Sequence, residues 1–103
     1  MKRLFIYGTL MLGDVQRRVI GRVVPMQTAT LNGYRKDSVT LGIETYPRIT
    51  VDADTFVEGA VIELTDDELV RVDHYEGSEY VRIVVTLTDD TAAWAYAEPP
   101  SDD

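Results

Sequence analysis

The sequence contains no cysteine and only one histidine, His74, among its 103 residues. The absence of cysteine excludes disulfides, thiolate zinc sites and a cysteine nucleophile. A single histidine also excludes metal sites that need several imidazole ligands. A Ser-His-Asp triad would have to use His74, and the residues around it do not resemble a nucleophile elbow.

The chain also lacks an apolar run near the roughly 20 residues that a membrane helix needs, and it does not open on a signal-peptide pattern. Basic residues are few: 10 against 18 acidic ones, which gives a net charge of −8. A field of this sign opposes binding to nucleic acid and to anionic membranes. We therefore expect a cytoplasmic protein that binds neither, and the sequence does not predict its oligomeric state.

Six strands are predicted from apolar runs, alternation and β-branched residues. They are expected over residues 1–7, 22–34, 46–51, 56–64, 80–87 and 92–97. Asn32-Gly33 is a turn signal that could divide residues 22–34 into a strand, a turn and a second strand, and Asp52–Thr55 is read as a turn. The region 35–44 gives no clear signal.

A short helix is predicted over residues 15–20. Asp14 is placed to cap it and Gly21 to end it. On this helix Gln16 and Arg17 are expected to face water.

Together these elements predict an α+β fold: a small, antiparallel-rich mixed β-sheet that curls into a barrel, with two short helices. Most successive strands are expected in hairpin order. Residues 1–98 are expected to form a single domain, and residues 99–103 an acidic, disordered tail.

The stretch Tyr7-Gly8-Thr9-Leu10 ends the first apolar run. Gly8 allows the backbone a turn that most residues avoid, and a small hydroxyl residue after it leaves N–H groups uncovered by side chains. Such a bend can hold a negatively charged oxygen. This stretch is the first candidate for a functional loop.

Glu76 is the second candidate. Thr65 and Glu68 form a capping box, which predicts the second helix over residues 66–75, and Glu76-Gly77 ends it. A carboxylate near a helix C-terminus is disfavoured by the helix dipole, which raises its pKa and favours acid–base use. Tyr7, Tyr75 and Tyr80 flank the two candidate segments and would suit a small polar ligand against an apolar wall.

Two other interpretations of these residues can be made. The Gly8-Thr9 bend could hold a phosphate, although no Gly-Lys-Ser/Thr follows it. Asp73, Glu76 and Glu79, each three residues apart, could ligate Mg²⁺ or Ca²⁺. Gly77, however, is expected to end the helix that would align these carboxylates.

Both candidate segments resemble motifs of the gamma-glutamylcyclotransferase-like family. Residues 4–10, Leu-Phe-Ile-Tyr-Gly-Thr-Leu, resemble its opening signature, and residues 72–77, Val-Asp-His-Tyr-Glu-Gly, followed by Tyr80 and Arg82, resemble its second motif. Further landmarks run in family order: Arg17-Arg18 and Gly21, Leu31-Asn32-Gly33-Tyr34, Tyr46-Pro47, and Gly59.

The resemblance implies a barrel-like mixed sheet with both motifs at one end. It implies a transferase- or lyase-type enzyme that releases 5-oxoproline from a gamma-glutamyl amine or gamma-glutamyl amino acid, without metal or organic cofactor. Glu76 would be the general acid–base. The residues expected to bind the small-molecule substrate are Tyr7, Gly8, Thr9, Leu10 and Tyr80.

This chemistry is compatible with the composition, because the substrate's own α-amine attacks its γ-carbonyl and no protein nucleophile is needed. One carboxylate can move both protons if its pKa is raised toward neutrality. The alternative is a non-catalytic small-ligand-binding or protein-interaction domain on the same fold.

Overall fold

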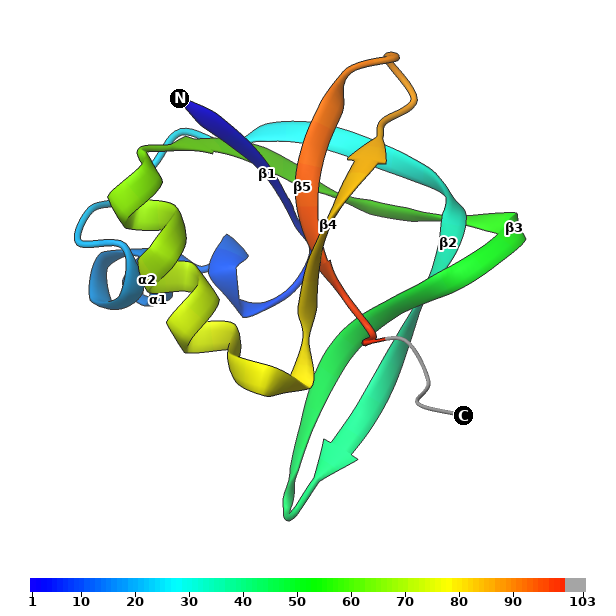
Figure 1. Cartoon of the computed structure of the whole chain (residues 1–103), viewed down its shortest axis with the longest axis horizontal. Helices are drawn as coiled ribbons and strands as arrows, with labels where there is room; N and C mark the ends of the chain where they lie inside the picture. Colours follow the sequence, from blue (N-terminus) through cyan, green and yellow to red (C-terminus); the bar gives the residue numbers. More distant parts are fainter. Residues whose placement is uncertain (100–103) are drawn as a thin grey trace.

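A curled five-stranded mixed sheet forms the body of the protein in the computed structural model, which describes residues 1–99 (Figure 1). The strands are β1 (Lys2–Ile6), β2 (Gln27–Leu41), β3 (Glu44–Leu64), β4 (Val81–Thr86) and β5 (Ala92–Ala97). Their order across the sheet is β2-β3-β1-β5-β4, and only the β1–β5 pair is parallel within this sheet. The predicted fold class, an antiparallel-rich mixed sheet with two helices, is therefore confirmed.

The curl of the sheet brings its two edge strands toward each other. The backbone N–H of Thr88, just after β4, donates to the carbonyl of Thr30 in β2 at 3.0 Å. This contact lies between segments that the strand order places at opposite edges. The sheet therefore forms a partly closed barrel, as predicted.

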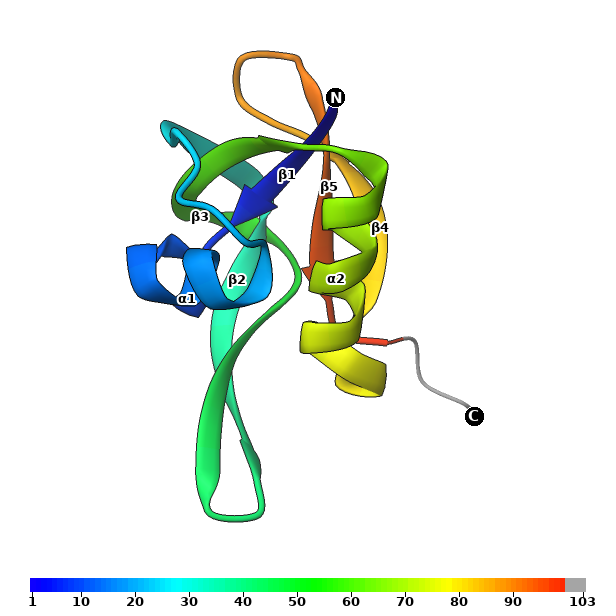
Figure 2. The ribbon, with the colours of Figure 1, turned by 90° about the vertical axis from the view of Figure 1, so that its left-hand side faces the viewer.

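Two helices, α1 (Gly13–Val19) and α2 (Asp66–Glu76), lie on the same side of the sheet (Figure 2). Short 3-10 helices, η1 (Thr9–Met11) and η2 (Gly77–Glu79), follow β1 and α2. In residues 1–99 no helix has both the length and the apolar character that crossing a bilayer requires. The predicted tail, residues 99–103, lies outside the described residues except for Pro99.

Strand β1 is central, and both of its faces are buried. Leu4 and Ile6 pack in the cluster that includes the helix residues Leu69 and Val72. The side chain of Phe5 points to the opposite face of the sheet and packs inside its curl. The turn that follows β1 is therefore held in place from both sides of the sheet.

The β2–β3 hairpin differs from the prediction, which had divided it into shorter strands. Asn32-Gly33 is not a turn: β2 continues through it, with a register shift between Asn32 and Tyr34 and a φ of +85° at Gly33. Residues 52–55 on β3 lie opposite this bulge and also remain within the strand. The six predicted strands are therefore five, because long-range pairing outweighs local turn propensity.

The chain reverses at Gly42-Ile43, where the hairpin has its two-residue turn. Gly42 has a φ of +67°, which favours glycine at this position. Beyond the bend opposite Gly33, the end of the hairpin projects as an arm from the body of the sheet (Figure 1). This arm carries the start of β3 to one end of the barrel.

Two predictions about helix α1 were wrong, namely its cap and the exposure of Gln16. Its N-cap is Leu12, without a side-chain hydrogen bond, and Asp14 lies inside the first turn. Gln16 is fully buried rather than facing water. Gly21 does follow the helix with a φ of +101°, and its N–H donates to the Arg17 carbonyl.

Gln16 is buried because its side-chain amide forms hydrogen bonds with a backbone group of η1, before the helix, and with one in the segment after the helix. Its Nε2 donates to the Leu10 carbonyl at 2.8 Å, and its Oε1 accepts from the Val24 N–H at 3.0 Å. We expect Gln16→Ala to lower the free energy of unfolding by about 3 kcal/mol, because two buried backbone groups lose their partners. Urea denaturation measures this change. Arg17→Ala, at the exposed neighbouring position, should change it by less than about 0.5 kcal/mol, and equal effects would contradict the assignment.

The predicted capping box at the start of α2 is present, between Thr65 and Glu68. Glu68 also accepts hydrogen bonds from Arg22, at 2.7 and 3.1 Å. The Arg22 hydrogen bond, aided by the Thr65 N–H, lowers the pKa of Glu68 to about 2. Helix α2, which ends at the predicted functional residue Glu76, is thus fixed at its N-terminus by a charged pair.

This lowered pKa predicts how stability depends on pH. A carboxyl with a folded pKa below its unfolded value stabilises the fold above the unfolded pKa, and this contribution is lost as pH falls from about 4.5 to about 2. Glu68→Gln should therefore be less stable than the wild type at pH 7, by about 1–2 kcal/mol given the exposed Arg22 partner. In denaturant titrations the difference should shrink below about pH 4.5 and disappear as pH falls through about 2. Glu58→Gln, at an exposed position, should show no such pH-dependent difference.

Candidate active site

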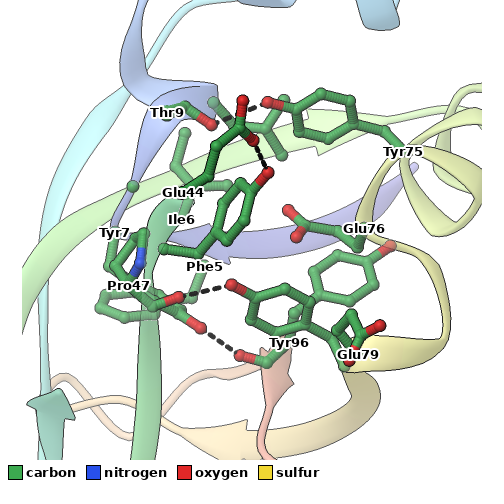
Figure 3. Close-up of a pocket in the computed structure, with 14 residues that line it drawn as sticks. Phe5, Ile6, Tyr7, Thr9, Glu44, Pro47, Tyr75, Glu76, Glu79 and Tyr96 are labelled. Carbon is green, nitrogen blue, oxygen red and sulfur yellow. Dashed lines mark hydrogen bonds between the residues drawn. The ribbon is translucent and has the colours of Figure 1, made fainter. Parts of the chain in front are cut away.

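A pocket of about 540 Å³ opens at the end of the sheet where β1 stops (Figure 3). The segment after β1, the start of β3, the end of α2 with η2, and the end of β5 form its walls. Every site residue predicted from the sequence lines it: Tyr7, Gly8, Thr9, Leu10, Glu76 and Tyr80. The structure thus brings together two segments that are about seventy residues apart in the sequence.

The turn after β1 is shaped by contact with β3. Gly8 has a φ of −135°, so glycine is not required there by a left-handed backbone. A Cβ on Gly8 would instead lie 2.8 Å from Cγ of Pro47, which leaves too little space for a side chain. The predicted reason for glycine was its backbone freedom; in the structure the reason is the close approach of Pro47 to this turn.

Backbone N–H groups are available in this turn. The first hydrogen bond of η1 runs from the Met11 N–H to the Gly8 carbonyl at 3.0 Å. The N–H groups of Thr9 and Leu10 therefore have no partner within the turn. The Leu10 side chain is buried in the core, so only its backbone is available to a ligand.

Glu76 is the last residue of α2, and Gly77 ends the helix with a φ of +71°. Its side chain is half-buried, and its carboxyl points into the pocket (Figure 3). Within residues 1–99 no group donates a hydrogen bond to this carboxyl or pairs with it. Burial therefore raises the pKa of Glu76 to about 7, because the ionised carboxyl loses solvent.

The tyrosines around Glu76 are held by hydrogen bonds. The Tyr7 hydroxyl donates to the Tyr96 carbonyl, and the Tyr80 hydroxyl donates to the Pro47 carbonyl at 2.6 Å. Burial raises the pKa of Tyr7 above the ordinary value of a tyrosine, so this phenol stays protonated at neutral pH. The rings give the pocket rigid, largely apolar walls.

The family can be assigned from comparison with known proteins. The model of the family described as "Gamma-glutamyl cyclotransferase, AIG2-like" matches residues 4–103. The chain belongs to this family. AIG2-like protein D of Arabidopsis thaliana is 34% identical over 111 residues, which cover 97% of this chain and 72% of that protein. AIG2-like protein C of the same plant is 34% identical over 107 residues, covering 94% and 61%.

Solved structures agree with this family assignment. An Arabidopsis thaliana protein with a solution structure has a TM-score of 0.83 and 29% identity, covering 99% of this chain and 71% of that one. A structure named gamma-glutamyl cyclotransferase has a TM-score of 0.81 over 95% of this chain and 66% of that one; at 18% identity it shows a shared fold. Among the curated relatives reported above, this chain spans between 61% and 72% of the full length.

In this member of the gamma-glutamyl cyclotransferase, AIG2-like family, the pocket also contains residues that sequence reasoning did not assign to the site. These are Phe5, Ile6, Glu44, Tyr46, Pro47, Tyr75, Glu79 and Tyr96. Tyr75 had been noted as flanking Glu76, and its hydroxyl is hydrogen-bonded to that of Thr9 at 2.9 Å. Tyr46 and Pro47 are landmarks of the family resemblance that carried no predicted site role. The hairpin register brings them and Glu44, at the start of β3, to the pocket.

The two other interpretations of the motifs fit the pocket poorly. Asp73 is turned toward Arg82 and Tyr96, and in residues 1–99 no three His, Asp or Glu side chains form a group that could hold a metal ion. The described lining of the pocket contains carboxylates but no lysine or arginine, which disfavours a phosphate dianion. The site contains a half-buried carboxyl with a raised pKa, and a turn whose Thr9 and Leu10 N–H groups have no partner within that turn.

Proposed function

We propose that this protein is a gamma-glutamyl cyclotransferase that releases 5-oxoproline from a gamma-glutamyl amine or gamma-glutamyl amino acid, with Glu76 as the general acid–base. The observation that carries the proposal is the Glu76 carboxyl, half-buried in the pocket with its pKa raised to about 7. A group with this pKa accepts and donates protons efficiently near neutral pH.

The proposed reaction moves two protons from the substrate's α-nitrogen to the leaving nitrogen and needs no protein nucleophile. The ionised Glu76 carboxylate takes a proton from the substrate's α-ammonium group, and the free amine then attacks the γ-carbonyl carbon. A five-membered ring forms, and the carbonyl oxygen becomes an oxyanion. Glu76 gives its proton to the leaving nitrogen and takes the second proton from the positively charged ring nitrogen. The oxyanion re-forms the carbonyl as the C–N bond breaks, and 5-oxoproline is released. The amine takes the second proton from Glu76 and leaves as an ammonium ion, which restores the carboxylate.

The turn after β1 is suited to the charge that develops in this reaction. The N–H groups of Gly8, Thr9 and Leu10 would donate to the oxyanion and to the substrate's carboxylate. Tyr7 and Tyr80 would form the wall against which the gamma-glutamyl chain lies. Support for this arrangement comes from the shared pocket and from the absence of partners for the Thr9 and Leu10 N–H groups within their turn.

The test is a panel of gamma-glutamyl amines and gamma-glutamyl amino acids incubated with the purified protein. Mass spectrometry should detect 5-oxoproline and the released amine in equal amounts, above the rate of spontaneous cyclisation without protein. If no compound in a broad panel gives 5-oxoproline, the proposal fails. Ligand-induced NMR shifts at Gly8 and Glu76 without turnover would then favour a small-ligand-binding domain on the same fold.

A further inference from the structure

Five tyrosine hydroxyls surround the pocket that contains Glu76, and each is hydrogen-bonded elsewhere. They belong to Tyr7, Tyr46, Tyr75, Tyr80 and Tyr96. Their partners are backbone carbonyls, another hydroxyl or a different carboxylate. Figure 3 shows no hydrogen bond from any of the residues drawn to the Glu76 carboxyl. The site therefore holds many potential donors close to this carboxyl, and all of them are turned to other partners.

Tyr96 differs from the others because its hydroxyl is held by a carboxylate of α2, the helix that also carries Glu76. The Tyr96 hydroxyl donates to Oδ1 of Asp73. The same Oδ1 lies 3.0 Å from Nε of Arg82, and the Arg82 guanidinium stacks over the Trp94 ring at 4.4 Å. Asp73 is thus fixed from β4 and β5 while it accepts from Tyr96.

Asp73 and Glu76 are three residues apart on α2, so their side chains lie within one turn of each other on the same side of the helix. A hydroxyl bonded to Asp73 is therefore about one helical turn from the Glu76 carboxyl. Burial and the hydrogen bond to Asp73 raise the pKa of Tyr96, and the negative charge of Glu76 adds to this effect.

We propose that Asp73 is a positioning residue that holds the Tyr96 hydroxyl away from the Glu76 carboxyl. A donated hydrogen bond stabilises the ionised form of a carboxyl and makes it a weaker base. By holding the donor that lies about one helical turn away on the same side of α2, Asp73 keeps Glu76 able to accept a proton near neutral pH. The effect of this hydrogen bond on catalysis rests on the proposed acid–base role of Glu76.

Other charged and titratable groups surround the site and have to be separated from this effect. They are Tyr7 after β1, Glu44, Tyr46 and Arg48 on β3, Tyr75 on α2, Glu79 on η2, Tyr80 before β4, and Arg82 on β4. Removing Asp73 also removes a negative charge, which by itself favours ionisation of Glu76. The experiment therefore compares variants that differ only in the Tyr96 hydroxyl.

The test is the titration of the Glu76 carboxyl carbon, followed by ¹³C NMR. In Asp73→Ala the released Tyr96 hydroxyl should donate to Glu76 and lower the titration midpoint by at least about one pH unit from its wild-type value. In the double variant Asp73→Ala, Tyr96→Phe the released hydroxyl is absent, and the midpoint should stay within about half a unit of wild type. An equal downward shift in both variants would assign the effect to charge and overturn the proposal.

Two single variants complete the comparison. Asp73→Asn keeps an oxygen that can accept from Tyr96, and Tyr96→Phe removes the hydroxyl; both should titrate near the wild-type midpoint. If Asp73→Ala does not fold, Asp73→Ser replaces it, because the shorter hydroxyl side chain cannot reach Tyr96 in the same way. A midpoint near wild type in either of the Ala and Ser variants would overturn the proposal. Because the titration is read from Glu76 itself, the result is independent of 5-oxoproline release.

Discussion

Glu76→Gln is expected to lower the rate of 5-oxoproline release by about 10³-fold or more. Glutamine has nearly the same shape as glutamate but cannot exchange a proton. A group that both removes a proton from the attacking amine and protonates the leaving nitrogen contributes to two steps, and each general acid–base step is worth about 10²–10⁴-fold. The measurement is initial-rate kinetics on whichever substrate in the panel turns over fastest.

Glu79→Gln is the matched control for this loss. Glu79 lies three residues further along the chain and lines the same pocket, but its side chain is exposed. This variant should retain activity within about threefold of wild type, because a charge change on a solvent-exposed side chain is largely screened. If the two glutamine variants lose activity equally, or if Glu76→Gln retains a tenth of it, Glu76 is not the acid–base.

The pH dependence of activity and of stability, measured for the wild type and for Glu76→Gln, gives a second test of the role of Glu76. The ionised form of Glu76 accepts the first proton, so kcat/KM of the wild type should fall about tenfold per pH unit below about 7. The stability of the wild type should have the opposite pH dependence: it should decrease as pH rises toward about 7. A carboxyl with a raised folded pKa destabilises the fold as pH rises from about 4.5 to about 7, so Glu76→Gln should be more stable than wild type above pH 7 by about 2 kcal/mol.

The sequence was sufficient for the parts of the site that depend on local signals. The capping box of Thr65 and Glu68 predicts α2, and Gly77 predicts its end, which together locate Glu76. The central strand and the last strand are equally clear, because short apolar runs between turn residues have few alternatives. The resemblance of the two motifs then predicted that the ends of β1 and α2 meet.

The rest of the site depends on pairing between residues far apart in the sequence. Gly33 and residues 52–55 have the composition of turns, yet they form a bulge and its opposite strand in one long hairpin. Without that register, nothing in the sequence brings Pro47 to Gly8 or Glu44 to the pocket. The fixed orientation of the pocket tyrosines likewise follows from tertiary hydrogen bonds that no local pattern encodes.

Gln16 illustrates the same limit for the core. A glutamine that precedes two exposed arginines on a short helix is normally solvated. Here its amide is fully buried and bridges the Leu10 carbonyl and the Val24 N–H, because the irregular chain on both sides needs hydrogen-bond partners. The turn that carries the proposed oxyanion-binding N–H groups is thus held partly by a residue predicted to face water.

Gly59→Ala is expected to be the most destabilising small substitution in the sheet. Gly59 lies on β3 opposite Ala29, and a Cβ there would be 2.2 Å from the Ile6 carbonyl oxygen and 2.9 Å from Cζ of Phe5. The first of these atoms belongs to the backbone of the central strand, so it cannot move without disturbing the β1–β3 pairing. We expect a loss of about 3–5 kcal/mol in the free energy of unfolding, near the upper end for overpacking.

Gly13→Ala is the control that separates this clash from the general effect of adding a methyl group to glycine. Gly13 begins α1, and the nearest atom to a Cβ there is Cγ2 of Val23 at 3.9 Å, an ordinary contact. Alanine should be neutral or stabilise the helix by up to about 1 kcal/mol. Thermal and urea unfolding of both variants measure the difference, and a loss below about 1 kcal/mol for Gly59→Ala would mean that β1 can shift. Phe5 and Ile6 also line the pocket, so a shift of β1 would alter the turn that carries Gly8. A Gly59→Ala protein with normal stability and normal activity would therefore contradict the rigid placement of that turn.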